Sequence, residues 1–271
     1  MCLYELRNNT MFKNFFESLG RKVLEGFEFV GGLANLVAQA FYWMFVPPFK
    51  KGRIFEQAKK AGIDSLLIVS ALALFIGIIM ALQTAYQMQR LGSEMYIASI
   101  VALSIVRELG PVITALVVAG RVGAAIAAEI GSMQVTEQID ALQVFAANPV
   151  KYLVVPRLLV LSLMLPLLTL YADILGILGG YLICVYKLGI SGTMYMQITF
   201  DSLLYKDLFT GLLKTVFFGM LIAIVSCYEG FNVKGGAEGV GRATTRAVVG
   251  SFILIITADC FFTALFYFVF P

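Results

Sequence analysis

Charged side chains interrupt the long apolar stretches of the sequence, and they are the first candidates for chemistry. They are Arg107, Glu108, Asp173, Lys214 and Asp259. An ionised group in a water-free apolar environment costs several kcal/mol unless it pairs with an opposite charge or reaches water. These residues therefore either form ion pairs that hold helices together or line a cavity that receives the charged part of a ligand. The sequence leaves both interpretations open.

Arg107 and Glu108 stand shortly before a helix-opening pair, Gly110-Pro111. Because proline has no backbone N–H, the groups around it need partners from protein or water. Lys214 lies in a separate apolar stretch. It could pair with Glu108 or Asp173, or it could attract a lipid phosphate.

The residue types that are missing exclude several classes of enzyme. The sequence has no histidine, which excludes His-based acid–base chemistry, Ser-His-Asp triads and His-ligated metal sites. The four cysteines show no CxxC spacing, so we expect no metal site. No glycine is followed by lysine, so a phosphate-binding P-loop is absent. Any ATP that drives this protein must be bound by another subunit.

A short amphipathic helix is predicted at about 134–146, between two apolar runs. Thr136 is its expected N-cap and Glu137 its first-turn acid, which suits the helix dipole. The candidate docking residues on this helix are Thr136, Glu137, Gln138, Asp140 and Leu142. Its polar face carries acids and amides, whereas a helix that lies on lipid usually carries Lys and Arg. Docking to a protein partner is therefore favoured over lying on the membrane surface.

The glycine-rich segment from Glu229 to Arg246 is predicted to be a tight loop on the same side of the membrane. Its polar residues Glu238, Arg242 and Arg246 are expected at the level of the lipid headgroups. The glycine spacing matches neither the dinucleotide nor the P-loop fingerprint.

The elements that position these residues follow from the composition. Of the 271 residues, 60% are hydrophobic and 14% are charged, and the mean hydropathy is +0.88. A soluble domain carries roughly 25% charged residues, so this is an all-α integral membrane protein. Apolar runs of about 20 residues predict five spans. They lie at about 64–86, 97–128, 154–186, 208–228 and 247–270.

A sixth apolar stretch, at about 27–46, ends in an aromatic cluster before Pro47-Pro48. Tyrosine and tryptophan prefer the membrane interface, so we predict an N-terminal interfacial helix, with a spanning helix as the alternative. Residues 1–19 are expected to form a tail that precedes a single domain over 20–271. Either Met1 or Met11 could be the initiating residue.

The basic residues predict the orientation of the chain. With five spans, only Arg90, Lys187 and Lys206 fall on one side, and three of the 20 Lys and Arg residues lie within spans. The remaining 14 lie on the other side. The positive-inside rule then places the N-terminus in the cytoplasm and Pro271 in the periplasm.

Two segments resemble the MlaE-type permease family. They are RELGPVITALVVAGRVGAAIAAEIGSMQVTEQIDALQVFAANPVKYLVVPR, at 107–157, and EGVGRATTRAVV, at 238–249. The resemblance runs from about residue 20 to the C-terminus. It implies the membrane subunit of an ABC transporter in the bacterial inner membrane, without enzymatic activity of its own. The substrate would be phospholipid moved between the inner and outer membranes.

The family resemblance also implies roles and partners. The helix at 134–146 would be the cytoplasmic coupling helix between spans 2 and 3, where the ATPase docks. Arg107, Glu108 and Lys214 would lie near a lipid-binding cavity at the centre of a homodimer. The expected partners are two copies of a cytoplasmic ABC ATPase, which binds ATP and Mg²⁺, and a periplasmic MCE-domain protein. We expect no cofactor in this chain and no nucleic-acid partner.

Two functions of other classes remain as alternatives. An ion-coupled secondary transporter of lipids or small molecules would use Glu108, Asp173 and Asp259 for ion coupling. A non-transporting membrane scaffold would need only the helix-packing pattern. The sequence predicts neither the direction of transport nor the lipid headgroup.

Overall fold

The computed structural model describes residues 20, 24, 26–46 and 51–269. The predicted tail at 1–19, with both candidate start residues, and the C-terminal Pro271 lie outside the described residues. The described part of the chain is helical with short connections and contains no strand. The all-α prediction is therefore confirmed.

Among the described residues, five helical segments are long and apolar enough to cross a membrane, as predicted. They are Ile54–Arg90, Glu94–Val135, Val150–Tyr186, Tyr205–Phe231 and Gly236–Phe268. Most of them extend past the predicted apolar runs, because a helix continues beyond the hydrocarbon core wherever its backbone can still form hydrogen bonds. The chain is thus a multi-pass membrane protein.

The helical elements that build these segments have the following bounds. The first segment contains α2 (Lys51–Ala61), η1 (Ile63–Ser65) and α3 (Leu66–Arg90). The second contains η2 (Glu94–Tyr96), α4 (Ile97–Ser104), η3 (Ile105–Leu109), α5 (Gly110–Val118), η4 (Ala119–Gly123) and α6 (Ala124–Val135). The remaining elements are α7 (Gln138–Val144), η5 (Val150–Val154), α8 (Val155–Tyr186), α9 (Gly192–Ser202), α10 (Tyr205–Phe231) and α11 (Gly236–Val269).

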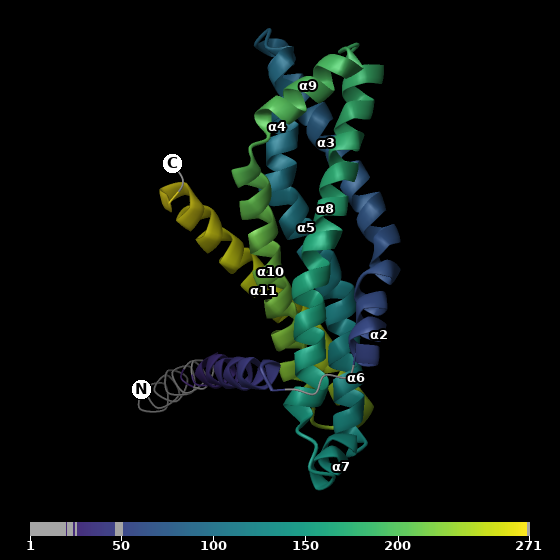
Figure 1. Cartoon of the computed structure of the whole chain (residues 1–271), viewed down its shortest axis with the longest axis vertical. Coiled ribbons are helices and arrows are strands. Elements are labelled where there is room, and N and C mark those ends of the chain that lie inside the picture. The colour runs from purple at the N-terminus through teal and green to yellow at the C-terminus, as the bar shows by residue number, and fades with distance from the viewer. Residues whose placement is uncertain (1–19, 21–23, 25, 47–50, 270–271) are drawn as a thin grey trace, which may run out of the picture.

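The helices form an elongated bundle with two distinct ends (Figure 1). One end carries α7 and the other carries α9; we call them the α7 end and the α9 end. Near the α7 end, the N-terminal helix at 26–44 lies across the bundle axis (Figure 1). That orientation is the one expected of an interfacial helix and not of a span.

Helix α8 is the centre of the bundle, because it packs against α3 on one side and α10 on the other. Its contact with α3 is close: a Cβ on Gly77 would lie 1.9 Å from the carbonyl oxygen of Gly176. Glycine therefore allows the two backbones to touch at this level. By contrast, α11 leans away from the bundle as it approaches the C-terminus (Figure 1).

Two π-helical turns, η3 and η4, interrupt the second span. The first, Ile105–Leu109, lies directly before Gly110 and Pro111. Pro111 cannot donate to the carbonyl four residues earlier, so a regular α-helix cannot continue through this point. The chain accommodates the proline with a wider turn in which Gly110 N–H donates to the carbonyl of Ile105.

Helix α9 was not predicted, because its sequence GTMYMQITFDS has no long apolar run. Its buried residues Tyr195 and Thr199 stand one helical turn apart, a signal that would have identified it. Burial raises the pKa of Tyr195, and its hydroxyl donates to the carbonyl of Ile177 on α8.

Candidate functional site

Four of the charged residues that interrupt the apolar stretches meet in one cluster around Lys214 of α10: Arg107, Glu108, Asp259 and Lys214 itself. Its side chain is 3% exposed, and its Nζ lies within 3.4 Å of five oxygen atoms. Glu108 accepts from Nζ at 2.9 and 3.0 Å, and Asp259 of α11 accepts at 2.9 Å. We call Arg107, Glu108, Asp207, Lys214, Asp259 and Thr263 the central polar cluster.

Thr263 and the backbone of Arg107 complete the surroundings of the ammonium group. Lys214 Nζ lies 2.7 Å from Thr263 Oγ1, which itself donates to Glu108 at 3.0 Å. Nζ also donates to the carbonyl of Arg107 at 3.4 Å. That carbonyl is the one that Pro111 leaves without an intrahelical donor four residues later. The proline that disrupts the helix thus supplies an acceptor for the buried lysine.

Arg107 pairs with Asp207 at the start of α10. Its Nε donates to Asp207 Oδ1 at 2.7 Å, and a terminal nitrogen lies 2.5 Å from the same oxygen. Asp207 is buried, and its other oxygen accepts from the backbone N–H of Leu204 at 3.1 Å. The sequence prediction missed Asp207, although an acid in the first turn of an apolar helix is a recognisable capping signal.

The two cations of the cluster differ in what they can do. The donors of Lys214 are engaged inside the cluster, and it balances two carboxylates. By contrast, the side chain of Arg107 is 53% exposed, and Asp207 is the one carboxylate in the described structure that binds it. A guanidinium with free donors at the edge of apolar helices is suited to bind an anionic group, especially a phosphate. Asp173, the other predicted partner of Lys214, does not join the cluster.

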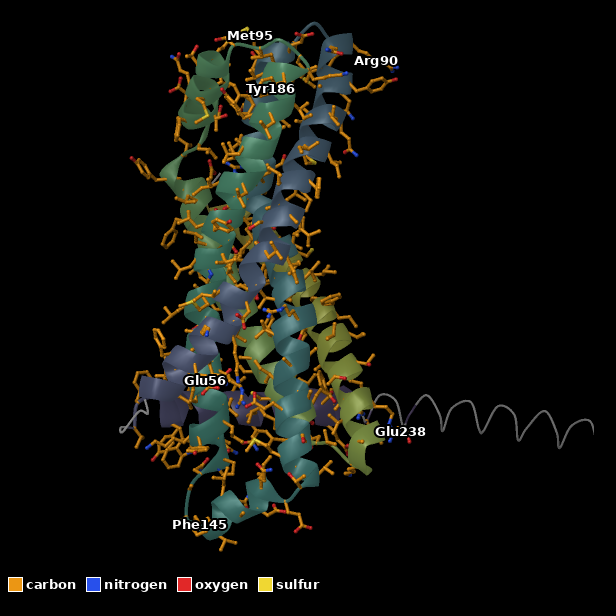
Figure 2. All side chains as sticks on the ribbon, turned by 90° about the vertical axis from the view of Figure 1, so that its right-hand side faces the viewer. Glu56, Arg90, Met95, Phe145, Tyr186 and Glu238 are labelled. Atoms are coloured by element: carbon orange, nitrogen blue, oxygen red, sulfur yellow. The ribbon has the colours of Figure 1, made fainter. Side chains whose placement is uncertain are left out.

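Helix α7 forms the tip of the α7 end, where Figure 2 labels Phe145. The predicted cap is wrong: Thr136 ends α6, and its hydroxyl donates back to the carbonyl of Ser132 at 2.8 Å. Helix α7 begins at Gln138 after Glu137, which adopts a left-handed conformation with φ of 58°. The connection between α6 and α7 is therefore a sharp turn and not a capped helix start.

The side chains on α7 divide between the bundle and the exterior. Ile139 is buried and Leu142 is half-buried, so they hold the helix against the bundle. Gln138 and Asp140 are exposed. Val144 and Phe145 are also exposed, by 84% and 82%. An aromatic side chain this exposed outside the spans marks a surface that another protein can cover.

Glu238, Arg242 and Arg246 lie on the first turns of α11 and not in a loop, so this part of the prediction is wrong. The loop is only the short connection between α10 and α11 at 232–235, and α11 begins at Gly236. Arg242 pairs with Glu238 at 2.5 Å, one helical turn away. Arg246 lies 3.4 Å from Glu229 at the end of α10. Glu238 is at the α7 end (Figure 2).

A second buried cation, Arg157 of α8, lies near the α7 end. One terminal nitrogen contacts Glu129 of α6 at 3.0 Å, and the other donates to the carbonyl of Leu153 at 2.8 Å. The residue is buried although it is charged. Within the described ranges, no group of three or more metal-binding side chains comes together.

The fold and the cluster define a helical membrane protein that has five candidate spans in the part of the chain that the structure describes, with a charged site within them. Comparisons with known proteins identify its family. The family model "Permease MlaE" matches residues 54–265. The chain belongs to the MlaE permease family, and it is an ABC transporter permease subunit.

Three relatives illustrate the range of similarity. A probable ABC transporter permease protein of Rickettsia felis is 43% identical over 95% of this chain and 99% of its own length. A protein of Synechocystis with the same description is 39% identical over 83% of this chain and 86% of its own length. The intermembrane phospholipid transport system permease protein MlaE of Haemophilus influenzae is 32% identical over 94% of this chain and 98% of its own length.

Proposed function

We propose that this chain moves phospholipids between the inner and outer membranes, driven by a separate cytoplasmic ATPase. The observation that carries the proposal is the half-exposed guanidinium of Arg107, beside the central polar cluster and among apolar helices. A phospholipid needs such a site: a cation for its phosphate and apolar walls for its acyl chains. The name of the Haemophilus relative supports phospholipid as the substrate.

In this proposal Arg107, Glu108 and Lys214 have separate tasks. Arg107 binds the headgroup phosphate through the donors that Asp207 leaves free. Lys214 and Glu108 hold η3 against α10 through their 2.9 Å ion pair, which fixes the direction of the Arg107 side chain. Asp259 ties the same lysine to α11. A movement of α11 relative to α10 would then be transmitted through Lys214 to Glu108 and the lipid site.

Helix α7 is the proposed coupling helix on which the ATPase docks. Its exposed tip, Val144 and Phe145, is apolar, and Glu137, Gln138 and Asp140 supply a polar rim. A cavity of about 710 Å³ between the N-terminal helix and α7 is lined by residues such as Trp43, Asp140 and Asn148. ATP and Mg²⁺ would be bound by the ATPase, and this chain needs no cofactor. Glu238, Arg242 and Arg246 are exposed at the same end.

In the proposed homodimer, α11 lies at the interface between the two copies. Only 11% of the most apolar stretch of its span is buried within the chain. Exposed residues such as Ile253, Ile256 and Phe261 could be covered by lipid or by a second copy. A second copy would close the open side of the central polar cluster, to which α11 contributes Asp259 and Thr263. An MCE-domain protein would bind at the α9 end.

The orientation in this proposal follows the basic residues. The α7 end faces the cytoplasm and the α9 end faces the periplasm of a bacterial inner membrane, which puts the N-terminus inside and the C-terminus outside. The domain is taken to run over 20–271. The positive-inside rule supports the orientation.

The decisive experiment is lipid transfer by the chain reconstituted with its ATPase and MCE protein in vesicles that contain a labelled phospholipid. Replacing Arg107 by alanine is expected to lower ATP-driven transfer at least about tenfold, the effect of losing one charge-assisted contact. The matched control is Arg90→Ala, which removes an exposed arginine at the α9 end. Equal transfer by the Arg107 variant and the wild type would refute the lipid role. Transfer driven by an ion gradient without the ATPase would instead support the secondary-transporter alternative.

A further inference from the structure

Asp173 lies in the middle of α8 and is 4% exposed, yet the described structure gives it no ion-pair partner. Its Oδ1 is buried without a hydrogen-bond donor. One turn earlier on the same face of α8, Thr169 is fully buried and its Oγ1 also has no partner. Two buried side-chain oxygens on one helix, four residues apart and both without a hydrogen-bond partner, are unusual in a protein interior.

The carboxyl group of Asp173 faces the start of α5. A Cβ on Gly110 would lie 1.8 Å from Asp173 Oδ1 and 3.0 Å from the carbonyl oxygen of Ile105. Both oxygens therefore lie within 3.0 Å of the point that a Cβ on Gly110 would occupy, next to the π-helical turn η3. Two oxygens that both accept hydrogen bonds repel each other unless one of them carries a hydrogen.

The surroundings supply no positive charge to Asp173. The elements packed against α8 carry several charged groups, among them Arg107 and Glu108 of η3, Arg90 of α3, and Lys206, Asp207, Lys214 and Glu229 of α10, but none of them forms an ion pair with Asp173 in the described structure. Arg107 bonds Asp207, and Lys214 bonds Glu108 and Asp259. From α3, the residues at this level are small and apolar, such as Ala73 and Gly77.

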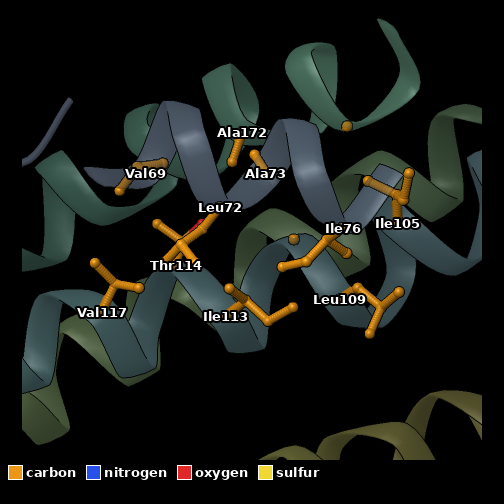
Figure 3. A pocket seen from close by; sticks show the side chains of 12 residues that line it. Val69, Leu72, Ala73, Ile76, Ile105, Leu109, Ile113, Thr114, Val117 and Ala172 are labelled. Carbon is orange, nitrogen blue, oxygen red and sulfur yellow. The ribbon is translucent and has the colours of Figure 1, made fainter. Parts of the chain in front are cut away.

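The space beside Gly110 and Ala172, close to Asp173 in the fold, offers little room for water. An apolar crevice between α3, η3, α5 and α8 contains Gly110 and Ala172 in its wall (Figure 3). Its cavity volume is about 20 Å³, enough for about one water molecule. The side chains that Figure 3 shows around it are almost all hydrocarbon, so a water there would find few partners.

We propose that Asp173 is an intramembrane proton-binding site, and that its protonated carboxyl positions η3 by donating a hydrogen bond to the adjacent backbone carbonyl. An unpaired carboxylate in hydrocarbon costs several kcal/mol, and a carboxyl group in that situation takes up a proton. Once protonated, the group has a donor, and the carbonyl of Ile105 accepts it. The positioning role rests on the proposed function, because η3 carries Arg107 and Glu108. The binding of a proton by Asp173 does not rest on the proposed function.

The proton is tested by infrared spectroscopy of the full-length protein in lipid. The difference between the wild type and Asp173→Asn is expected to show one carbonyl band of a protonated carboxylic acid, shifted in heavy water. The matched control is Asp259→Asn, which removes an aspartate bound to Lys214 and is expected to remove carboxylate bands instead. Loss of carboxylate bands in the Asp173 variant would overturn the proposal.

A second measurement covers the case in which the variants do not fold. Dicyclohexylcarbodiimide, an apolar reagent that modifies protonated carboxyl groups, is added to the wild type and the adduct is located by mass spectrometry. Modification of Asp173 that is unaffected by sodium ions is expected. Protection by sodium would show a metal cation in place of the proton, and absence of an adduct together with absence of the protonated band would also overturn the proposal.

The positioning role is tested by lipid transfer. Asparagine can donate to the same carbonyl without a charge, so Asp173→Asn is expected to keep transfer within about twofold of the wild type. Asp173→Ala loses the donor and is expected to lower transfer about fivefold. Equal loss in both variants would refute positioning by a hydrogen bond. If the wild type transfers no lipid, the proposed function fails while the infrared result still decides the proton.

Discussion

Replacing Lys214 by methionine is the most direct test of the central polar cluster. The two side chains are similar in length, so the change removes the charge and keeps much of the volume. It leaves Glu108 and Asp259 without their shared cation. Both oxygens now 2.9 Å from Nζ would face each other across an apolar side chain.

The magnitude follows from the exposure of the two carboxylates. Removing one partner of a fully buried ion pair costs about 3–5 kcal/mol. The side chain of Glu108 is 40% exposed and that of Asp259 is 19% exposed, so water can partly solvate both groups. We therefore expect the lower end, about 3 kcal/mol, which for a chain of this size lowers the melting temperature by about 6–12 °C.

The assay is thermal unfolding of the purified protein in one detergent. Samples are heated to a series of temperatures, and size-exclusion chromatography then measures the folded fraction that remains. The control is Lys187→Met, at an exposed position after α8, with an expected change below about 0.5 kcal/mol. A triple variant, Lys214→Met with Glu108→Gln and Asp259→Asn, should recover most of the lost stability, because no charge is then left unpaired. An unchanged melting temperature for the single variant, or no recovery in the triple variant, would refute the reasoning.

Three further predictions concern other parts of the chain. Gly110→Ala should lower the melting temperature because its Cβ would overlap the Asp173 carboxyl, whereas Gly241→Ala, with open space around it, should not. Glu129→Gln should destabilise the fold by about 2 kcal/mol, because it weakens the ion pair of the buried Arg157; the same thermal assay measures this loss. Phe145→Asp should leave stability unchanged and reduce co-purification of the ATPase, since the side chain is exposed at the tip of α7; full retention of the ATPase would argue against docking there.

The spans were predictable because hydrocarbon imposes one requirement on every residue that crosses it. A run of about 20 apolar residues has few alternatives to a spanning helix. The stranded charges were recognisable for the same reason: Arg107, Glu108 and Lys214 stand out against apolar neighbours. The sequence could not show which charges meet, since that depends on how helices distant in sequence pack.

The features that sequence reasoning missed depend on local geometry. Asp207 lies at a span boundary, where an acid is common and attracts no notice. The turn before α7 needs a left-handed residue, and Glu137 is not a residue type that indicates one. The start of α11 was not recognised because its glycines usually indicate a loop. At Gly239 the structure has no room for a side chain, since a Cβ would lie 2.0 Å from the carbonyl oxygen of Lys234.

The two π-helical turns of the second span have a consequence for how one helix meets several neighbours. Each turn adds one residue, and one residue rotates everything that follows by about 100° around the helix axis. The side chains of α5 are therefore rotated around the helix axis relative to those of α4, and the side chains of α6 are rotated again relative to those of α5. A regular helix of the same length could present a given stripe to only one partner. Along this span, α4 packs against α3 and α9, α5 packs mainly against α8, and α6 packs mainly against α10 and α11.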